Sequence, residues 1–327
     1  PALRGLKDMD VQMWNPGHVM ARGAFRKPDK GAFMTLVDSG HDGHMAWSEL
    51  LELYMGSGSL VACQFPLMET FTTEPMAAEL LRRLADYLNQ PVYCQPTKRL
   101  AVLGGASEPV LRRLKDVRTA YDIVPSVPAQ PGVLLVDLSP SDSLPDATAL
   151  RAFTEGGGTL ILHRARPEHQ AWLEKLLNRP VQISIQPYQA WTDRLALDRR
   201  DGLLEGVNNL DLYWRSQLIG ESPEHRWQVS CGVAHGLERG QVLYLVRVDG
   251  VADEVFPGGL STVSLGKGRV VIDQLKWEVS PKDMICGSPA RVLSMLLTNL
   301  GIERRLPAPK PALPPGIVYE PIDISAV

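Results

Sequence analysis

The sequence contains little cysteine, few aromatic residues and no strong excess of one charge. Its four cysteines in 327 residues are too scattered for a disulfide scaffold and form no CxxC metal pair. Lys and Arg number 34 against 37 Asp and Glu, and this net charge of −3 provides no basic surface for nucleic acid or an anionic membrane. No run approaches the roughly 20 apolar residues of a membrane-spanning helix. Neither nucleic acid nor a membrane is therefore expected as a partner.

The composition that remains is that of a globular chain. Hydrophobic residues make up 44% and charged residues 22%, enough for one large or two medium cores. Residues 306–316 hold five prolines in eleven positions, which favours an extended linker. Because a linker implies a segment beyond it, either residues 317–327 pack back on the body of the protein or the natural polypeptide continues past residue 327; we favour continuation.

The centre of the chain alternates short apolar runs with amphipathic stretches. The runs predict strands at 99–103, 121–124, 133–138, 159–162 and 181–185, and the stretches predict helices at 108–115, 146–155 and 167–177. Strands that alternate with helices are typical of a parallel sheet covered on both faces. Since parallel crossovers are right-handed, the favoured topology is α/β, doubly wound and flavodoxin-like.

Three stretches of the chain recur in the same order. They are 1–10 and 202–211, 56–65 and 266–275, and 75–88 and 289–300. Asp10 corresponds to Asp211, and Gln64 to Gln274; the last pair of stretches reads as amphipathic helices with proline in the first turn. This pattern predicts a duplicated domain. The repeated aspartates are interpreted as turn residues, because two copies of one catalytic acid in separate domains would not converge on one substrate.

The two copies are unequal. The second has the predicted strands of 99–185 before its first recurring stretch, whereas the first copy begins at that stretch. We therefore predict three regions: 1–95 as the C-terminal part of a first domain, 96–305 as a complete second domain, and 306–327 as a linker and the start of a following segment. The first domain, with an open sheet edge and an uncovered apolar face, is expected to be completed by a preceding segment of a longer protein.

Three motifs carry a resemblance to a known family. These motifs, at residues 204–214, 265–274 and 297–301, resemble the class I glutamine amidotransferase-like accessory domains. Such domains occur in large bacterial glycoside hydrolases similar to the family 2 β-galactosidases. The tail at 319–326 also resembles the start of a carbohydrate-binding module. The resemblance implies tandem flavodoxin-like domains, the first incomplete. It also implies a non-catalytic role: positioning a catalytic domain, supporting oligomerisation or binding glycan. The implied partners are the neighbouring domains of the same secreted or periplasmic polypeptide, a carbohydrate and a second copy of the chain.

The residues needed for amidotransferase or glycosidase catalysis are not recognisable. A glutaminase needs a cysteine on a sharp strand-to-helix turn, but the strand at 159–162 is followed by His163-Arg164-Ala165, without Cys or Ser. A glycosidase needs two carboxyl groups across one cleft, and no such pair stands out. We assign no catalytic residue. The alternative is a hydrolase with its site where the parallel strands end, in a pocket formed by Gly104, Gly105, Asp137, Ser139 and His163.

Other candidate sites are weaker. His41 and His44, with His18 nearby in sequence, fall short of a convergent set of three metal ligands. Gly104 and Gly105 lack the spacing of a phosphate-binding loop, so no cofactor is predicted. Exposed tryptophans can stack on sugar rings; the candidates are Trp47, Trp191 and Trp227.

Overall fold

The computed structural model has two sheets with a helix shared between them. It describes residues 2–11, 14, 21–41, 44–55, 58–89, 96–140, 144–185, 195–197, 202–208, 211, 232–235, 242–249, 255–275, 277–278 and 289–305. None of the helices in these ranges combines the length and the apolar character needed to cross a bilayer.

The first unit, residues 2–89, is an antiparallel sheet with a helix on one face. Strand β3 lies at its centre, with β2 along one edge and β1 and then β4 along the other. The elements are η1 (Asp8–Val11), β1 (Phe25–Arg26), β2 (Ala32–His41), β3 (His44–Met55), β4 (Gly58–Cys63), α1 (Leu67–Thr70) and α2 (Pro75–Leu88).

Helix α2 begins and packs as its sequence predicts. Pro75 lies in the first turn, where its missing N–H leaves no helical hydrogen bond unmade, and the Glu74 side chain accepts a hydrogen bond from Met76 N at 3.3 Å. The buried residues recur every three or four positions and so share one face of the helix: Ala77, Leu80, Leu84 and Tyr87. This face forms a core with Leu50 of β3 and Val61 of β4.

The second unit, residues 96–305, is a mixed α/β fold built on an eight-stranded sheet. The strand order is β10-β12-β13-β14-β8-β7-β5-β6, parallel from β14 to β6 and antiparallel from β10 to β14. The strands are β5 (Leu100–Leu103), β6 (Tyr121–Val124), β7 (Val133–Asp137), β8 (Thr159–His163), β9 (Gln182–Ile185), β10 (Leu195–Leu197), β11 (Gly232–His235), β12 (Val242–Asp249), β13 (Val255–Leu265) and β14 (Gly268–Asp273). The helices are α3 (Glu108–Asp116), α4 (Ala147–Glu155), η2 (Pro167–His169), α5 (Gln170–Leu177) and α6 (Pro289–Asn299).

The predicted parallel sheet with helices is confirmed, with one exception. Strands β5, β7 and β8 and helices α3 and α4 lie within a residue of their predicted bounds. The apolar stretch at 181–185 also forms a strand, β9, but β9 pairs antiparallel with β11 in a separate two-stranded sheet. The expectation that it continues the parallel sheet is wrong, because β14, much later in the chain, occupies the place beside β8.

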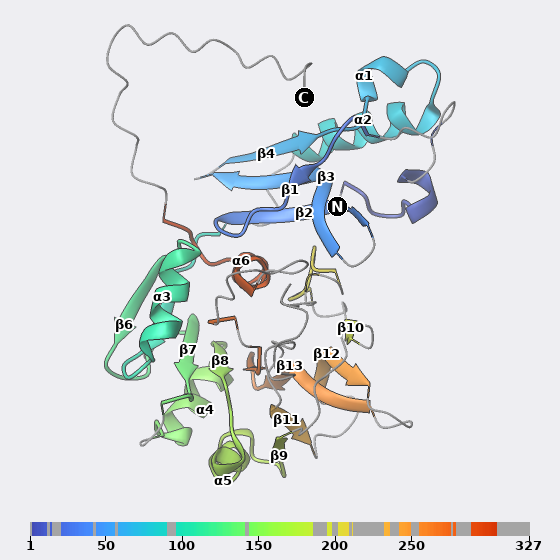
Figure 1. Cartoon of the computed structure of the whole chain (residues 1–327). Helices are drawn as coiled ribbons and strands as arrows, with labels where there is room; N and C mark the ends of the chain where they lie inside the picture. Colours follow the sequence, from blue (N-terminus) through green and yellow to red (C-terminus); the bar gives the residue numbers. More distant parts are fainter. Residues whose placement is uncertain are drawn as a thin grey trace, which may run out of the picture.

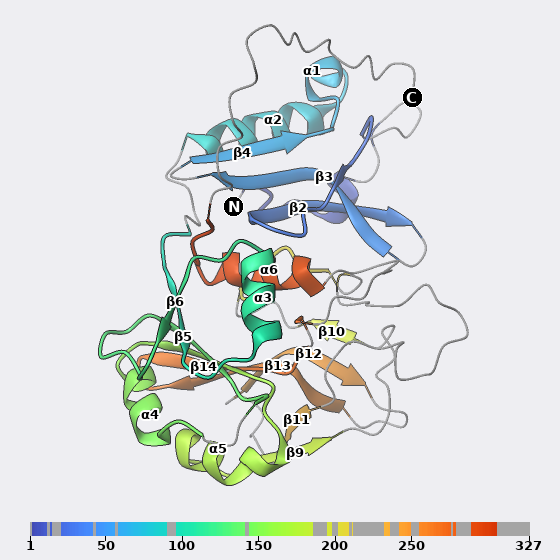
Figure 2. The ribbon, with the colours of Figure 1, turned by 60° about the vertical axis from the view of Figure 1, so that its left-hand side comes forward.

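The two units stack in layers (Figures 1 and 2). Helix α2 lies on the outer side of the first sheet, α6 and α3 lie between the sheets, and α4 and α5 cover the far face of the second sheet. The described residues of α6 from Pro289 to Thr298 are all buried, and one apolar cluster joins Phe33 and Leu51 of the first sheet to Leu135 of the second. The expectation of an uncovered face in the first unit is therefore wrong where β2 and β3 lie, because α6 covers them.

The hairpins that close the two units share their register. Leu53 lies opposite Leu60 in the β3–β4 pair, and Val263 lies opposite Val270 in the β13–β14 pair. The hairpin and the helix that follows it also pack alike: Leu50 and Val61 belong to the core with α2, and Leu260 and Val271 belong to the core with α6.

The glycine turns that open the recurring stretches are also alike. Leu6 N donates to Leu3 O at 3.0 Å, and Val207 N donates to Leu204 O at the same distance. Gly5 has a φ of 81° and Gly206 a φ of 75°, a left-handed conformation that glycine adopts without a steric penalty. The turns therefore have one backbone conformation in both units.

Candidate functional site

The sheet of the second unit reverses its strand order between β5 and β7. From β5 the chain moves outward to β6, then returns to β7 and continues to β8 in the other direction. Open parallel sheets bind ligands at the carboxyl ends of the strands beside such a reversal. Gly104 and Gly105 follow β5 at this edge, and Asp137 ends β7.

A cavity of about 610 Å³ opens at this reversal. Of the candidate pocket residues, Gly104, Gly105 and Asp137 line it, whereas Ser139 and His163 do not. Its walls are mostly apolar or proline: Leu103, Pro125, Val127, Val136, Leu138, Pro140, Leu144, Pro145 and Ala149. Asp137 and Asp146 are the only charged residues among its described lining. The cavity therefore suits an uncharged or cationic ligand.

The Asp137 carboxylate is held by four hydrogen bonds. Ser107 donates to Oδ2 from its backbone N at 2.9 Å and from Oγ at 2.6 Å, and Ser139 donates to Oδ1 from the same two groups at 2.9 and 2.6 Å. Burial raises the pKa of Asp137, but the hydrogen bonds from Ser107 and Ser139 outweigh it and bring the pKa below its usual value. Asp137 is thus an ionised group with both oxygens bonded, poorly suited to act as a general base.

The same contacts decide what can bind at the start of α3. Ser107 is the N-cap residue of α3, so the Asp137 carboxylate lies where a helix of this fold would bind a phosphate. A second anion there would be repelled by Asp137. The Gly104–Gly105 turn therefore does not form a phosphate site.

The turn after β8 has a strained backbone at its first residue. Arg164 follows the last residue of β8 and has a φ of 63°, a conformation that costs an ordinary residue about 1–2 kcal/mol. Arg164 N donates to Asp273 O at 2.8 Å, and its guanidinium forms an ion pair with Glu278. A nucleophile elbow places Ser or Cys on such a strained residue directly after a strand; here the residue is an arginine, which cannot act as a nucleophile.

His163, next to this turn, lies in a sealed polar cluster. Its ring is fully buried, with Nδ1 at 3.1 Å from Asp273 and Nε2 at 3.3 Å from Glu278, and it stacks on Trp277 with ring centroids 4.1 Å apart. Burial lowers the pKa of His163, but the interactions with Asp273 and Glu278 raise it more, to about 9. A histidine that is protonated at neutral pH and closed off from solvent cannot serve as a general base.

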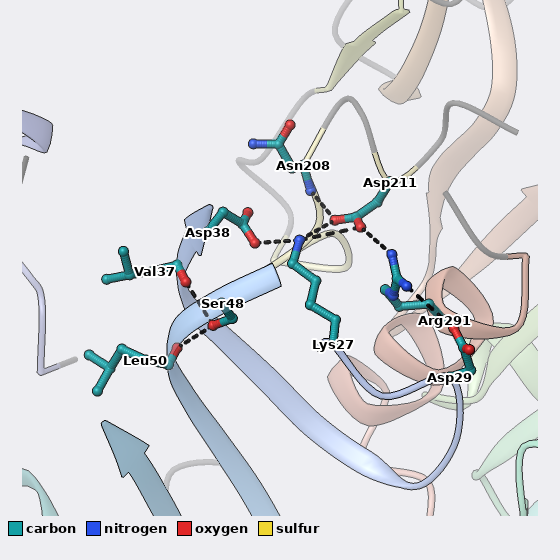
Figure 3. Close-up of polar contacts among 9 residues, drawn as sticks. All are labelled: Lys27, Asp29, Val37, Asp38, Ser48, Leu50, Asn208, Asp211 and Arg291. Atoms are coloured by element: carbon teal, nitrogen blue, oxygen red, sulfur yellow. Dashed lines mark hydrogen bonds and ion pairs between the residues drawn. The ribbon is translucent and has the colours of Figure 1, made fainter. Parts of the chain in front are cut away.

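A second buried polar cluster joins the two units (Figure 3). The Lys27 side chain is fully buried, with Nζ at 3.1 Å from Asp211 Oδ2 and in an ion pair with Asp38. Arg291 of α6 reaches Asp211 Oδ1 at 3.3 Å and Asp29 at 3.5 Å. Nothing in the sequence near Lys27 indicated this cluster; the one signal was the repetition of Asp211. The two buried cations thus share three carboxylates, of which only Asp211 is fully buried, and such a network can specify how the units are oriented.

The repeated aspartates are turn residues, as predicted. Asp10 Oδ2 accepts a hydrogen bond from Lys7 N at 2.8 Å, and Asp211 Oδ2 accepts one from Asn208 N at 3.0 Å. Only Asp211 has, in addition, the contacts with Lys27 and Arg291.

The remaining candidates are placed as follows. Trp47 on β3 is 39% exposed, whereas Trp191 and Trp227 lie outside the described residues. His41 and His44 pair across the β2–β3 hairpin, and His18 lies outside the described ranges. Within those ranges no three His, Cys, Asp or Glu side chains converge as metal ligands.

The cysteines offer no elbow in the described part of the chain. Cys63 lies half-buried at the end of β4, and burial raises the pKa of its thiol. Cys94, Cys231 and Cys286 lie outside the described residues.

Comparison with known proteins gives structural neighbours only. No family model and no curated protein matches this sequence. Similar solved structures include an exo-β-1,4-mannosidase from Opitutaceae bacterium strain TAV5, which is 12% identical over 62% of this chain and 35% of that chain, with a TM-score of 0.29. A β-galactosidase from Bacillus circulans is 13% identical over 72% of this chain and 36% of that chain, with a TM-score of 0.35. A ThuA-like protein from Bacteroides uniformis is also similar; it is 14% identical over 65% of this chain and 93% of that chain, with a TM-score of 0.36. The chain spans about a third of the length of both glycoside hydrolases, and at these TM-scores the likenesses carry no functional assignment.

Proposed function

We propose that this chain is a non-catalytic accessory region of a bacterial carbohydrate-degrading enzyme of the β-galactosidase type, and that it positions the catalytic domain of that enzyme. The observation that carries the non-catalytic part is Arg164 at the elbow after β8. The backbone strain that would expose a nucleophile is present, but the side chain there is bound to Glu278 in an ion pair.

The groups around the elbow support the same proposal. His163 and Asp273 have the contact of a base and its orienting acid, yet His163 is protonated and fully buried. Asp137, the other polar group at the strand ends, has both oxygens bonded to serines. In the part of the chain that the structure describes, no serine or cysteine bonds to His163, so proton transfer to a nucleophile has no route there.

The carbohydrate assignment rests on the sequence resemblance and on two features that suit sugars. The cavity at the β5–β7 reversal combines apolar walls with the carboxylate of Asp146, which can accept a hydrogen bond from a hydroxyl group. Trp47, 39% exposed, offers a stacking surface. Glycan binding is therefore one proposed interaction of this chain; contacts with neighbouring domains and self-association are proposed from the sequence resemblance alone.

We infer that the two units are copies of one flavodoxin-like domain, the first without its parallel strands. Three observations support this: the shared register of the β3–β4 and β13–β14 hairpins, the matching glycine turns, and the placement of α2 and α6 on the same face of their hairpins. A local sequence pattern can produce one of these features by chance, but hardly all three in the same order.

Turnover assays test the proposed function. The chain is incubated with p-nitrophenyl glycosides and, separately, with L-glutamine, and no product above the blank is expected. Turnover that disappears in His163→Gln or Asp137→Asn would contradict it and favour the alternative, a hydrolase with its site at the strand ends. Glycan binding is tested separately by titrating the chain with oligosaccharides and comparing it with the Trp47→Ala variant, which lacks the proposed stacking surface.

A further inference from the structure

The outer edges of the equivalent strands β4 and β14 differ. Strand β14 pairs with β13 on one side and, in parallel, with β8 on the other. Strand β4 pairs with β3, and within the described residues no strand lies along its other edge. The described strands of the first unit therefore leave an edge open at the position where the second unit continues its sheet.

The backbone groups on this edge can be assigned from the hydrogen bonds. Gln64 N donates to Glu49 O at 2.9 Å, so by alternation the amides of Leu60 and Ala62 face β3, and those of Ser59 and Val61 face outward. The residue equivalent to Ser59 is Arg269, whose amide donates to Gly158 O, just before β8, at 3.2 Å. The outward amides of β4 thus correspond to those that bind the parallel strand in the second unit.

The side chains on this edge also correspond to those that a neighbouring parallel strand and its helix cover in the second unit. Leu60 is 49% exposed, whereas Val270, its equivalent, is fully buried in the core that contains α4. Strand β4 also lacks the charges and prolines that protect free edges: its sequence is Gly-Ser-Leu-Val-Ala-Cys. By contrast, the edge strand β6 carries Asp122 in an ion pair with Arg99. The edge of β4 has the composition of an interior strand.

We propose that the outer edge of β4 binds a parallel β-strand of about five apolar residues, like β8, and that a helix of the same segment covers Leu60. This proposal rests on the inference that the units are copies of one domain. In the second unit the strands that continue the sheet beyond β14, namely β8, β7, β5 and β6, precede the glycine turn at Gly206 in sequence. The strand that binds β4 accordingly belongs to the polypeptide that precedes residue 1 in the natural protein.

Hydrogen exchange on two forms of the protein tests this proposal: the 327-residue chain and the polypeptide of the complete natural reading frame. The amides of Ser59 and Val61 are expected to exchange about 100-fold more slowly in the longer polypeptide at all protein concentrations. Absence of this protection, or a reading frame with no preceding segment, would overturn the proposal. Protection that appears only as the concentration rises would assign the edge to a second copy instead.

Two proline variants separate the edge from the fold. Ser59→Pro removes an outward amide and no hydrogen bond to β3, so it is expected to lower the melting temperature of the longer polypeptide and leave that of the 327-residue chain unchanged. Leu60→Pro removes a hydrogen bond to β3 and should destabilise both. Equal effects of Ser59→Pro in the two forms would contradict the proposal. Turnover in the glycoside or glutamine assay would defeat the proposed function but leave these results as they are.

Discussion

The first and second units contain the same hairpin, turn and helix in different surroundings. In the second unit β14 lies inside an eight-stranded sheet, while among the described strands of the first unit β4 lies at an edge. Register and turn geometry agree between the units even so, whereas burial differs at equivalent positions such as Leu60 and Val270. Local sequence therefore determines the hairpin, and the strands beside it determine how deeply it is buried.

A second difference concerns how each unit uses its repeated aspartate. Asp10 holds its own turn and is partly exposed, but Asp211 also binds Lys27 of the first unit and Arg291 of α6. Helix α6 likewise serves both sheets, whereas α2 packs on one. The second unit thus supplies both the apolar cover and the buried charges that hold the first unit in place.

The largest expected effect is at this aspartate. Asp211→Ala leaves Lys27 and Arg291 buried with one carboxylate fewer and should lower the free energy of unfolding by about 3–5 kcal/mol. Asp10→Ala, the matched control, removes a similar turn hydrogen bond without buried charges and should cost about 1 kcal/mol. Urea denaturation measures both; equal costs would show that the interface cluster contributes nothing.

The glycine turns give the next comparison. A Cβ at Gly206 would lie 2.7 Å from Met34 Sδ and 3.2 Å from Thr35 O, whereas a Cβ at Gly5 would meet open space. Both alanine variants carry the cost of a positive φ, about 1–2 kcal/mol, and Gly206→Ala should lose a further 1–3 kcal/mol, roughly, through overpacking against β2. If Gly5→Ala were the more destabilising variant in urea, the assigned contact with β2 would be wrong.

The histidine cluster of the second unit predicts a pH dependence. The pKa of His163 is about 9 in the folded protein, above its value of about 6.5 in an unfolded chain. At any pH between these two pKa values, folding is therefore accompanied by uptake of a proton by His163. This stabilisation is complete below pH 6.5 and is lost as the pH rises to 9, with a slope of at most about 1.4 kcal/mol per pH unit. His163→Gln should flatten that part of the stability profile; an unchanged slope in this variant would contradict the assignment.

The smallest expected effect is at the open edge. Val270→Ala should cost about 2 kcal/mol, because Val270 is fully buried, while Leu60→Ala should change the stability of the 327-residue chain by less than about 0.5 kcal/mol. Thermal or urea unfolding measures the pair. A large loss in Leu60→Ala would mean that the edge is covered in this chain.

Sequence periodicity was enough to predict the elements but not their partners. Apolar runs bounded by glycine located β5, β7 and β8, and helical spacing located α2 and α3. The sequence predicts α6 as an amphipathic helix, yet its polar residues are buried too: Arg291 binds Asp211, and Ser294 Oγ donates to Asp29 O at 3.3 Å. Nothing local reveals that Asp211 and the loop residue Asp29 of the first unit provide polar partners for that face.

In the candidate site, too, the sequence predicts which residues are present but not which groups they contact. Polar residues at strand ends are recognisable in sequence, so Asp137 and His163 could be selected. Their roles depend on groups far along the chain, since Asp273 lies 110 positions after His163 and Ser107 lies 30 positions before Asp137. The sequence also gives no warning that Arg164 adopts a positive φ, because arginine has no preference for that conformation.

Hydrogen exchange at Val61 and Val271 in the 327-residue chain tests the comparison between the units most directly. These equivalent residues share a register, and by alternation their amides point toward the outer edge of each hairpin, where β14 has β8 and β4 has no described neighbour. We predict that the Val271 amide exchanges at least about 100-fold more slowly than the Val61 amide. Equal protection of the two amides would contradict the account, because it would show that the first unit is as complete as the second.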